Sequence, residues 1–168
     1  MNHTLLVAGL GDIHLGDDGF GVKVIKRLAA FRLLDWVRLA DYGVRGLHLL
    51  YDVLDQDYDT IILVDIATRG GAPGTLYLIE ADVAADMETD LCTPEAYAMT
   101  SDMSVTFLRA CGSSSSRVLV LGCEPARVEE GIGLSTLVMQ AVEQATTLLL
   151  DIVWREGRVG VTGASAIM

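Results

Sequence analysis

The sequence predicts an α/β domain with a mainly parallel sheet, and two observations carry this prediction. Five short apolar runs alternate with segments of helical periodicity, in the order β-α-β-α-β-β-α-β-α. Each run is rich in branched side chains and ends at a glycine or an acid, which is typical of strands buried on both faces. A chain of 168 residues fits one domain. We expect this domain over residues 1–154 and a C-terminal tail over residues 155–168, where core periodicity is absent.

The strands are expected where the apolar runs lie. In chain order they are TLLVAG (4–9), WVRLAD (36–41), TIILVDI (60–66), GTLYLIE (74–80) and RVLVLG (117–122). The third and fourth runs are joined by ATRGGAP (67–73), a connector that is too short for a helical crossover. We therefore expect these two strands to form an antiparallel pair.

Helices are expected in four segments with apolar residues three and four positions apart. They cover residues 17–31, 45–55, 100–110 and 134–153. Asp17 or Asp18 is placed to act as the N-cap of the first helix, because a short side-chain oxygen can accept a hydrogen bond from a free N–H there. In the second helix the spacing puts Leu47, Leu50 and Leu54 on one side.

Composition limits the function. The formal net charge of −11 disfavours binding to nucleic acid, which is itself a polyanion. Mean hydropathy is high, at +0.41, but every apolar run is far shorter than the ~18–20 residues of a membrane-spanning helix. The N-terminal residues lack the basic start of a signal peptide. The three cysteines include no C-x-x-C motif, so we expect reduced thiols. Together with the short apolar runs and the N-terminal residues, this predicts a cytoplasmic protein without a membrane partner.

Acidic residues follow three of the predicted strands. Asp12, Asp17 and Asp18 follow the first strand, Asp41 closes the second and Asp65 closes the third. The carboxyl ends of parallel strands meet at one edge of a sheet, where ligands bind in folds of this class. Carboxylates that converge there suit a divalent metal ion. Simpler roles remain open, namely a helix cap for Asp17 and turn stabilisation for Asp41.

The glycine-rich stretch GLGDIHLGDDGFGV (9–22) is a poor phosphate loop. It lacks the third glycine of the dinucleotide fingerprint, and its carboxylates would repel a pyrophosphate. The sequence therefore gives only weak support to the hypothesis of a nucleotide-dependent enzyme with an irregular phosphate loop. Serine hydrolases and zinc proteases lack support, because neither G-x-S-x-G nor H-E-x-x-H is present.

Five stretches together resemble the maturation endopeptidases of [NiFe] hydrogenases. They are GLGDIHLGDDGFGV, DYGVRGLHLLYDVL, DTIILVDIATRGGAPGTLYLIE, VLVLGCEP and EEGIGLS. The likeness runs from Leu5 to Val153 and leaves out the tail. It implies a three-layer α/β sandwich, with a twisted five-stranded sheet flanked by helices. It also implies a peptidase of the acid-residue or metal-dependent type, and we expect this peptidase to be a monomer. Such an enzyme removes a C-terminal extension from the hydrogenase large-subunit precursor after nickel insertion and recognises the nickel that the precursor carries.

The resemblance also implies site residues. Asp18 and Asp65 match two metal ligands of the family, and Asp41 matches an aspartate near the site that could activate water. The family's third ligand is a histidine, which falls on Tyr97 in EAYAM (95–99). A shifted alignment would place Asp102 there instead.

The missing histidine leaves a second hypothesis open: a non-catalytic module of the same fold that binds the precursor or a metal. His3, His14 and His48 are the chain's only histidines, and none lies near position 97. We expect His14 to be solvated, His48 to pack on a helix and His3 to lie at the opposite end of the sheet. Cys123 ends the fifth strand, where a role as a small buried apolar residue is favoured over ligation.

Overall fold

The computed structural model describes residues 3–81 and 117–165, and it contains a single five-stranded sheet within them. The strands are β1 (Leu5–Leu10), β2 (Val37–Gly43), β3 (Thr60–Ile66), β4 (Leu76–Ala81) and β5 (Arg117–Cys123). They lie in the order β2-β1-β3-β5-β4, and the first four strands in this order are mutually parallel. All five predicted strands are confirmed to within two residues at each end.

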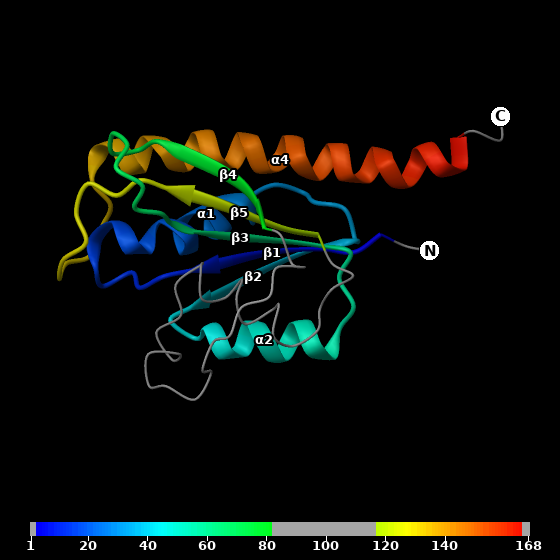
Figure 1. The fold of residues 1–168 in the computed structure, drawn as a ribbon, viewed down its shortest axis with the longest axis horizontal. Coiled ribbons are helices and arrows are strands. Elements are labelled where there is room, and N and C mark those ends of the chain that lie inside the picture. Colours follow the sequence, from blue (N-terminus) through cyan, green and yellow to red (C-terminus); the bar gives the residue numbers. More distant parts are fainter. Residues whose placement is uncertain (1–2, 82–116, 166–168) are drawn as a thin grey trace.

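The helices form a layer on each side of this sheet. They are the 3-10 helix η1 (Gly16–Gly19), α1 (Phe20–Leu28), α2 (Gly46–Asp55) and α4 (Thr136–Ser165). Figure 1 shows α1 and α4 on one side of the sheet and α2 on the other. The predicted three-layer α/β sandwich is therefore confirmed, while the predicted helix over residues 100–110 lies outside the described residues.

Alternating side chains of the parallel strands build two apolar cores. On β1, Leu5 and Val7 belong to the core under α1 and α4, whereas Leu6 and Ala8 belong to the core over α2. The same alternation holds on β3 and β5. Because both of their faces are covered, β1, β3 and β5 consist almost entirely of apolar residues, and this is why they could be located from the sequence.

Strand β4 has the expected direction but a different neighbour. It pairs antiparallel with β5, with Leu76 opposite Cys123, and β5 lies between β4 and β3. The prediction that the third and fourth strands pair directly is therefore wrong. The short connector does reverse the chain, but it leaves a gap in the sheet that β5 fills from far along the sequence.

Helix α2 buries a face that includes Leu50 of the predicted side but is shifted away from Leu54. Leu49, Leu50 and Val53 are buried, whereas Leu54 is 55% exposed. Spacing alone could not separate the two faces, because apolar residues occupy most of this helix. His48 is exposed, so its predicted packing role is also wrong.

Helix α4 continues to Ser165 and so includes most of the segment predicted to be a tail. Glu156 anchors this part of the helix: its carboxylate accepts a hydrogen bond from Thr60 Oγ1 at 3.1 Å and pairs with Arg117. His3 Nε2 lies 3.4 Å from the same carboxylate, at the end of the sheet that was predicted for it. By length and hydropathy, residues 136–157 would suffice to cross a membrane, but the apolar side of this helix packs on the sheet.

Candidate functional site

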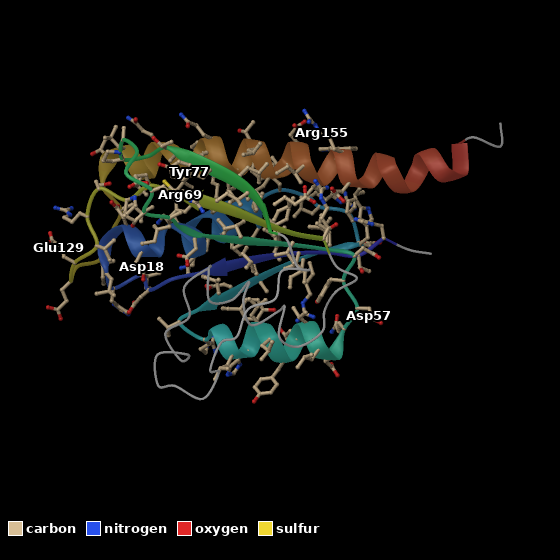
Figure 2. The ribbon with its side chains drawn as sticks, in the orientation of Figure 1. Asp18, Asp57, Arg69, Tyr77, Glu129 and Arg155 are labelled. Atoms are coloured by element: carbon tan, nitrogen blue, oxygen red, sulfur yellow. The ribbon has the colours of Figure 1, made fainter. Side chains whose placement is uncertain are left out.

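The carboxyl ends of β1 and β3 define the place where a ligand site is expected. The two strands are neighbours in the sheet, and the chain leaves β1 toward β2 on one side and leaves β3 toward β4 on the other. A crevice forms outside the strand ends at such a point, where the connections diverge. Figure 2 shows Asp18 at this end of the molecule.

Two glycines bring helix α1 down onto these strand ends. A Cβ added at Gly21 would lie 2.2 Å from the carbonyl oxygen of Val64 and 2.4 Å from that of Leu10. A Cβ added at Gly9 would lie 2.5 Å from the side chain of Ile25. Side chains at these positions would push α1 away from the sheet. The two glycines therefore allow α1, and the 3-10 helix η1 that directly precedes it, to lie close to the strand ends.

Gly11 lies next to both Asp18 and Asp65. It has a φ of +116°, and a Cβ there would lie 1.9 Å from the main-chain oxygen of Asp18 and 3.3 Å from Oδ1 of Asp65. The main chain of Asp18 and the carboxylate of Asp65 therefore lie against the same glycine. This arrangement brings two of the predicted metal ligands, from separate elements, to one point at the sheet edge.

The carboxylate of Asp18 is half-buried and held by its own loop. Its Oδ2 accepts a hydrogen bond from the backbone N–H of Asp12 at 2.9 Å. Burial raises the pKa of Asp18 above its ordinary value, and the negative charge of Asp12 adds to this effect, although the hydrogen bond opposes it. A cation bound beside Asp18 would relieve both unfavourable contributions.

The carboxylate of Asp65 is almost fully buried, at 4% exposure, and Oδ1 accepts a hydrogen bond from the backbone N–H of Ile66 at 2.8 Å. The residue is the last but one of β3, and it follows five consecutive buried residues of that strand. A carboxylate in such a position requires compensation by hydrogen bonds, charge or a metal ion. Its burial also gives the site one rigid oxygen donor.

Asp41 is the exposed member of the set. It lies on β2 opposite Gly9 of β1, and its Oδ1 would lie 3.7 Å from a Cβ added at Gly43. The carbonyl oxygen of Gly43 accepts a hydrogen bond from the N–H of Gly11 at 3.0 Å. Asp41 therefore borders the same glycine loop as Asp18 and Asp65, and it is the most exposed of the three residues.

Asp17 does not cap a helix. The residue that precedes α1 is Gly19, and neither Asp17 nor Asp18 makes a side-chain cap there, because both lie inside η1. Asp17 is fully buried and instead accepts four hydrogen bonds, from the N–H groups of Ala126, Arg127 and Ser135 and from the Ser135 hydroxyl. Burial alone would raise the pKa of Asp17, but these bonds outweigh it and the pKa is lowered. Asp17 thus clamps the glycine loop to the start of α4.

Glu124 is a structural acid of the site that the sequence analysis did not single out. It is 5% exposed, and it accepts hydrogen bonds from the N–H groups of Arg69 (2.8 Å) and Gly70 (3.2 Å) and from the hydroxyl of Tyr77 (2.9 Å). Figure 2 labels Arg69 and Tyr77 near this end of the sheet. Glu124 therefore fixes the loop that follows Asp65. The signal that could have found it is the one that found Asp65, an acid directly after a buried strand.

The third predicted ligand cannot be placed, since Tyr97 and its alternative Asp102 lie outside the described residues. Within residues 3–81 and 117–165, no three His, Cys, Asp or Glu side chains come together as a metal site. His14 is exposed, as expected. Cys123 is fully buried in the core under α4, where burial raises its pKa to about 12, so its predicted structural role is confirmed.

The fold and the site thus define an α/β protein with acidic groups gathered where the connections diverge, a class that includes metal-dependent and carboxylate-dependent hydrolases. Comparisons with known proteins narrow this class. The family model for hydrogenase maturation proteases matches residues 22–152. Hydrogenase 2 maturation protease of Escherichia coli is 29% identical over 148 residues, which cover 87% of this chain and 88% of that protein. The hydrogenase expression/formation protein HoxM of Azotobacter vinelandii is 31% identical over 160 residues, covering 93% and 75%.

Solved structures agree with these matches. The hydrogenase maturating endopeptidase HybD of E. coli superposes with a TM-score of 0.74 at 25% identity, covering 92% of this chain and 94% of that one. The chain therefore belongs to the hydrogenase maturation protease family, which is a family of peptidases.

Proposed function

We propose that this protein is an endopeptidase that removes the C-terminal extension of a [NiFe] hydrogenase large-subunit precursor after nickel insertion. The nickel belongs to the precursor and is the feature that the enzyme recognises. Membership of the maturation protease family supports the reaction. The observation that supports the recognition step is that the main-chain oxygen of Asp18 and the carboxylate of Asp65 both lie against the same side of Gly11.

In this proposal Asp18 and Asp65 bind the precursor's nickel. Carboxylates are suitable oxygen ligands for a divalent ion, and two of them leave coordination positions for groups of the precursor. The buried Asp65 supplies a fixed donor, while the half-buried Asp18 supplies one that the glycine loop holds in place. We propose Tyr97 as the third contact, with Asp102 as the alternative.

Asp41 is the group that we assign to the chemical step. Its exposure at the end of β2 allows it to accept a proton from water while the water attacks the scissile carbonyl carbon. The resulting tetrahedral intermediate collapses with cleavage of the C–N bond, and the proton passes to the leaving amine. We further propose that the enzyme acts as a monomer in the cytoplasm, with the precursor as its partner.

The second candidate function is a precursor-binding module that does not cleave. The observation that favours it is Tyr97, which stands where the resemblance to the family places a ligand histidine. A neutral phenol is a poor ligand for nickel, since its pKa is ordinarily near ~10.

Intact mass spectrometry of a nickel-loaded precursor, after incubation with this protein, tests both functions. We expect the wild type to release a C-terminal fragment and Asp18→Asn and Asp65→Asn to release none. Asp35→Asn is the matched control, because Asp35 is exposed just before the start of β2, at the opposite edge of the sheet. A precursor that a histidine-bearing relative cleaves and this protein leaves intact would reject the peptidase and favour the binding module. In that case Tyr97→His is the variant to test next.

A further inference from the structure

A small hollow beside the candidate site has the properties of a binding site. It measures about 130 Å³ and lies between the glycine loop, the exposed side of α1 and the loop that precedes α4. An engineered apolar cavity of about 150 Å³ accommodates benzene, so this space is sufficient for one aliphatic side chain. Ile13, Ile132 and Leu134 supply its apolar walls. Ile132 is 80% exposed and Ile13 is 40% exposed, so two large apolar side chains that line the hollow are open to solvent together.

The positive charges at the hollow are unusual for this chain. Lys23 and Lys26 line it, and they are the only two lysines in the sequence. They are three residues apart on α1, so their side chains project from the same face of the helix. Both are exposed, and neither makes an ion pair within the described residues. Arg27, on the same helix, is neutralised by Glu143 of α4 at 2.8 Å.

These features indicate the chemistry of the ligand. Two unpaired ammonium groups on a chain of net charge −11 would attract a carboxylate from a partner, and the apolar walls would accept an aliphatic side chain next to it. The hollow shares Gly16 and Gly19 with the 3-10 helix that carries Asp18. A chain segment bound there therefore lies beside the group proposed to hold nickel.

We infer that this hollow, the lysine pocket, binds an acidic side chain and a neighbouring aliphatic side chain in the C-terminal extension of the precursor. The inference rests on the proposed function, because that function supplies the partner. The pocket gives the enzyme a second contact with its substrate that depends on sequence and is independent of the metal.

Binding of a nickel-loaded precursor to the immobilised full-length protein tests this inference without requiring cleavage. We expect the double variant Lys23→Gln/Lys26→Gln to raise Kd roughly tenfold, which is the combined effect of losing two ion pairs at exposed side chains. The control Arg32→Gln/Arg155→Gln removes the same charge at exposed sites outside the pocket lining and should leave Kd unchanged. Figure 2 shows Arg155 on α4, far from Asp18 and Glu129. Ile132→Ser should weaken binding in the same way as the lysine variant.

Changes in the precursor identify the segment that is bound. Replacing the extension's acidic side chains by amides should weaken binding to the wild type and have no further effect on the lysine variant. Equal Kd values for the wild type and the lysine variant would overturn the inference. The inference would also be overturned if the lysine variant lost as much affinity for the mature subunit, which has no extension. It would be overturned as well if the lysine variant still weakened binding after the acid-to-amide changes, because the lysines would then contact the terminal carboxylate. Lysine-dependent binding without cleavage would uphold the pocket while rejecting the peptidase.

Discussion

Asp17 and Ser135 are joined twice, by the backbone N–H of Ser135 to Oδ1 at 2.7 Å and by its hydroxyl to Oδ2 at 2.9 Å. The pair links the glycine loop after β1 to the residue that precedes α4. The adjacent residue, Asp18, is directed instead toward Asp12. Two consecutive aspartates in one 3-10 turn therefore have separate tasks: Asp17 holds the loop, and Asp18 faces the site.

This division predicts that Asp17→Asn destabilises the protein by about 3 kcal/mol. The asparagine keeps one acceptor oxygen, but its NH₂ group then faces N–H donors that the carboxylate had satisfied. Chemical denaturation followed by circular dichroism measures the loss. Asp35→Asn, at an exposed position, should change stability by less than about 0.5 kcal/mol. Equal stabilities for the two variants would show that the clamp contributes nothing.

Gly11→Ala is predicted to remove activity through displacement of the site. Its Cβ would overlap the main-chain oxygen of Asp18, and the φ of +116° disfavours any side chain. A displacement of about 1 Å at a reacting group can cost on the order of 100-fold in rate. Cleavage of the nickel-loaded precursor is the measurement, and thermal unfolding reports the accompanying strain.

Gly70→Ala separates strain from displacement. Gly70 also has a positive φ, +84°, but an added Cβ would meet no atom within 4 Å. This variant should lose about 1 kcal/mol of stability to backbone strain and keep its activity. If Gly11→Ala were as active as Gly70→Ala, the placement of Asp18 by Gly11 would not matter for function.

Much of the fold could be predicted because its signals are local. Strands buried on both faces are uniformly apolar, so β1, β3 and β5 stand out from their surroundings. The acids at the strand ends could be found for the same reason, since a charge directly after such a run is conspicuous. Knowledge of a parallel sheet then places Asp18, Asp41 and Asp65 at one edge.

The remaining features depend on contacts between distant parts of the chain. The partners of Asp17 lie 109 to 118 residues away, so its sequence context suggested a helix cap. The insertion of β5 between β3 and β4 and the burial of Glu156 against Thr60 also involve elements far apart in the sequence. Periodicity reports only which residues share a face and contains no information on which element will cover it.

Glu124 predicts a pH dependence of stability. Hydrogen bonds lower its pKa below the ordinary value of 4.5; the N–H of Arg69 makes the largest contribution, and the Tyr77 hydroxyl and the N–H of Gly70 add to it. The folded state therefore releases this proton more readily than the unfolded state does. The stabilisation is complete above about pH 4.5 and is lost as the pH falls through the lower folded pKa. Glu124→Gln should lack this contribution.

The measurement is the free energy of unfolding of the wild type and of Glu124→Gln between pH 3 and 7. Other carboxylates titrate in the same range, but they do so in both proteins, and the difference between the two curves isolates Glu124. We expect that difference to be largest and constant above about pH 5 and to shrink as the pH falls below 4.5. Parallel curves over the whole range would mean that the loop after Asp65 is held by contacts that do not depend on the charge of Glu124.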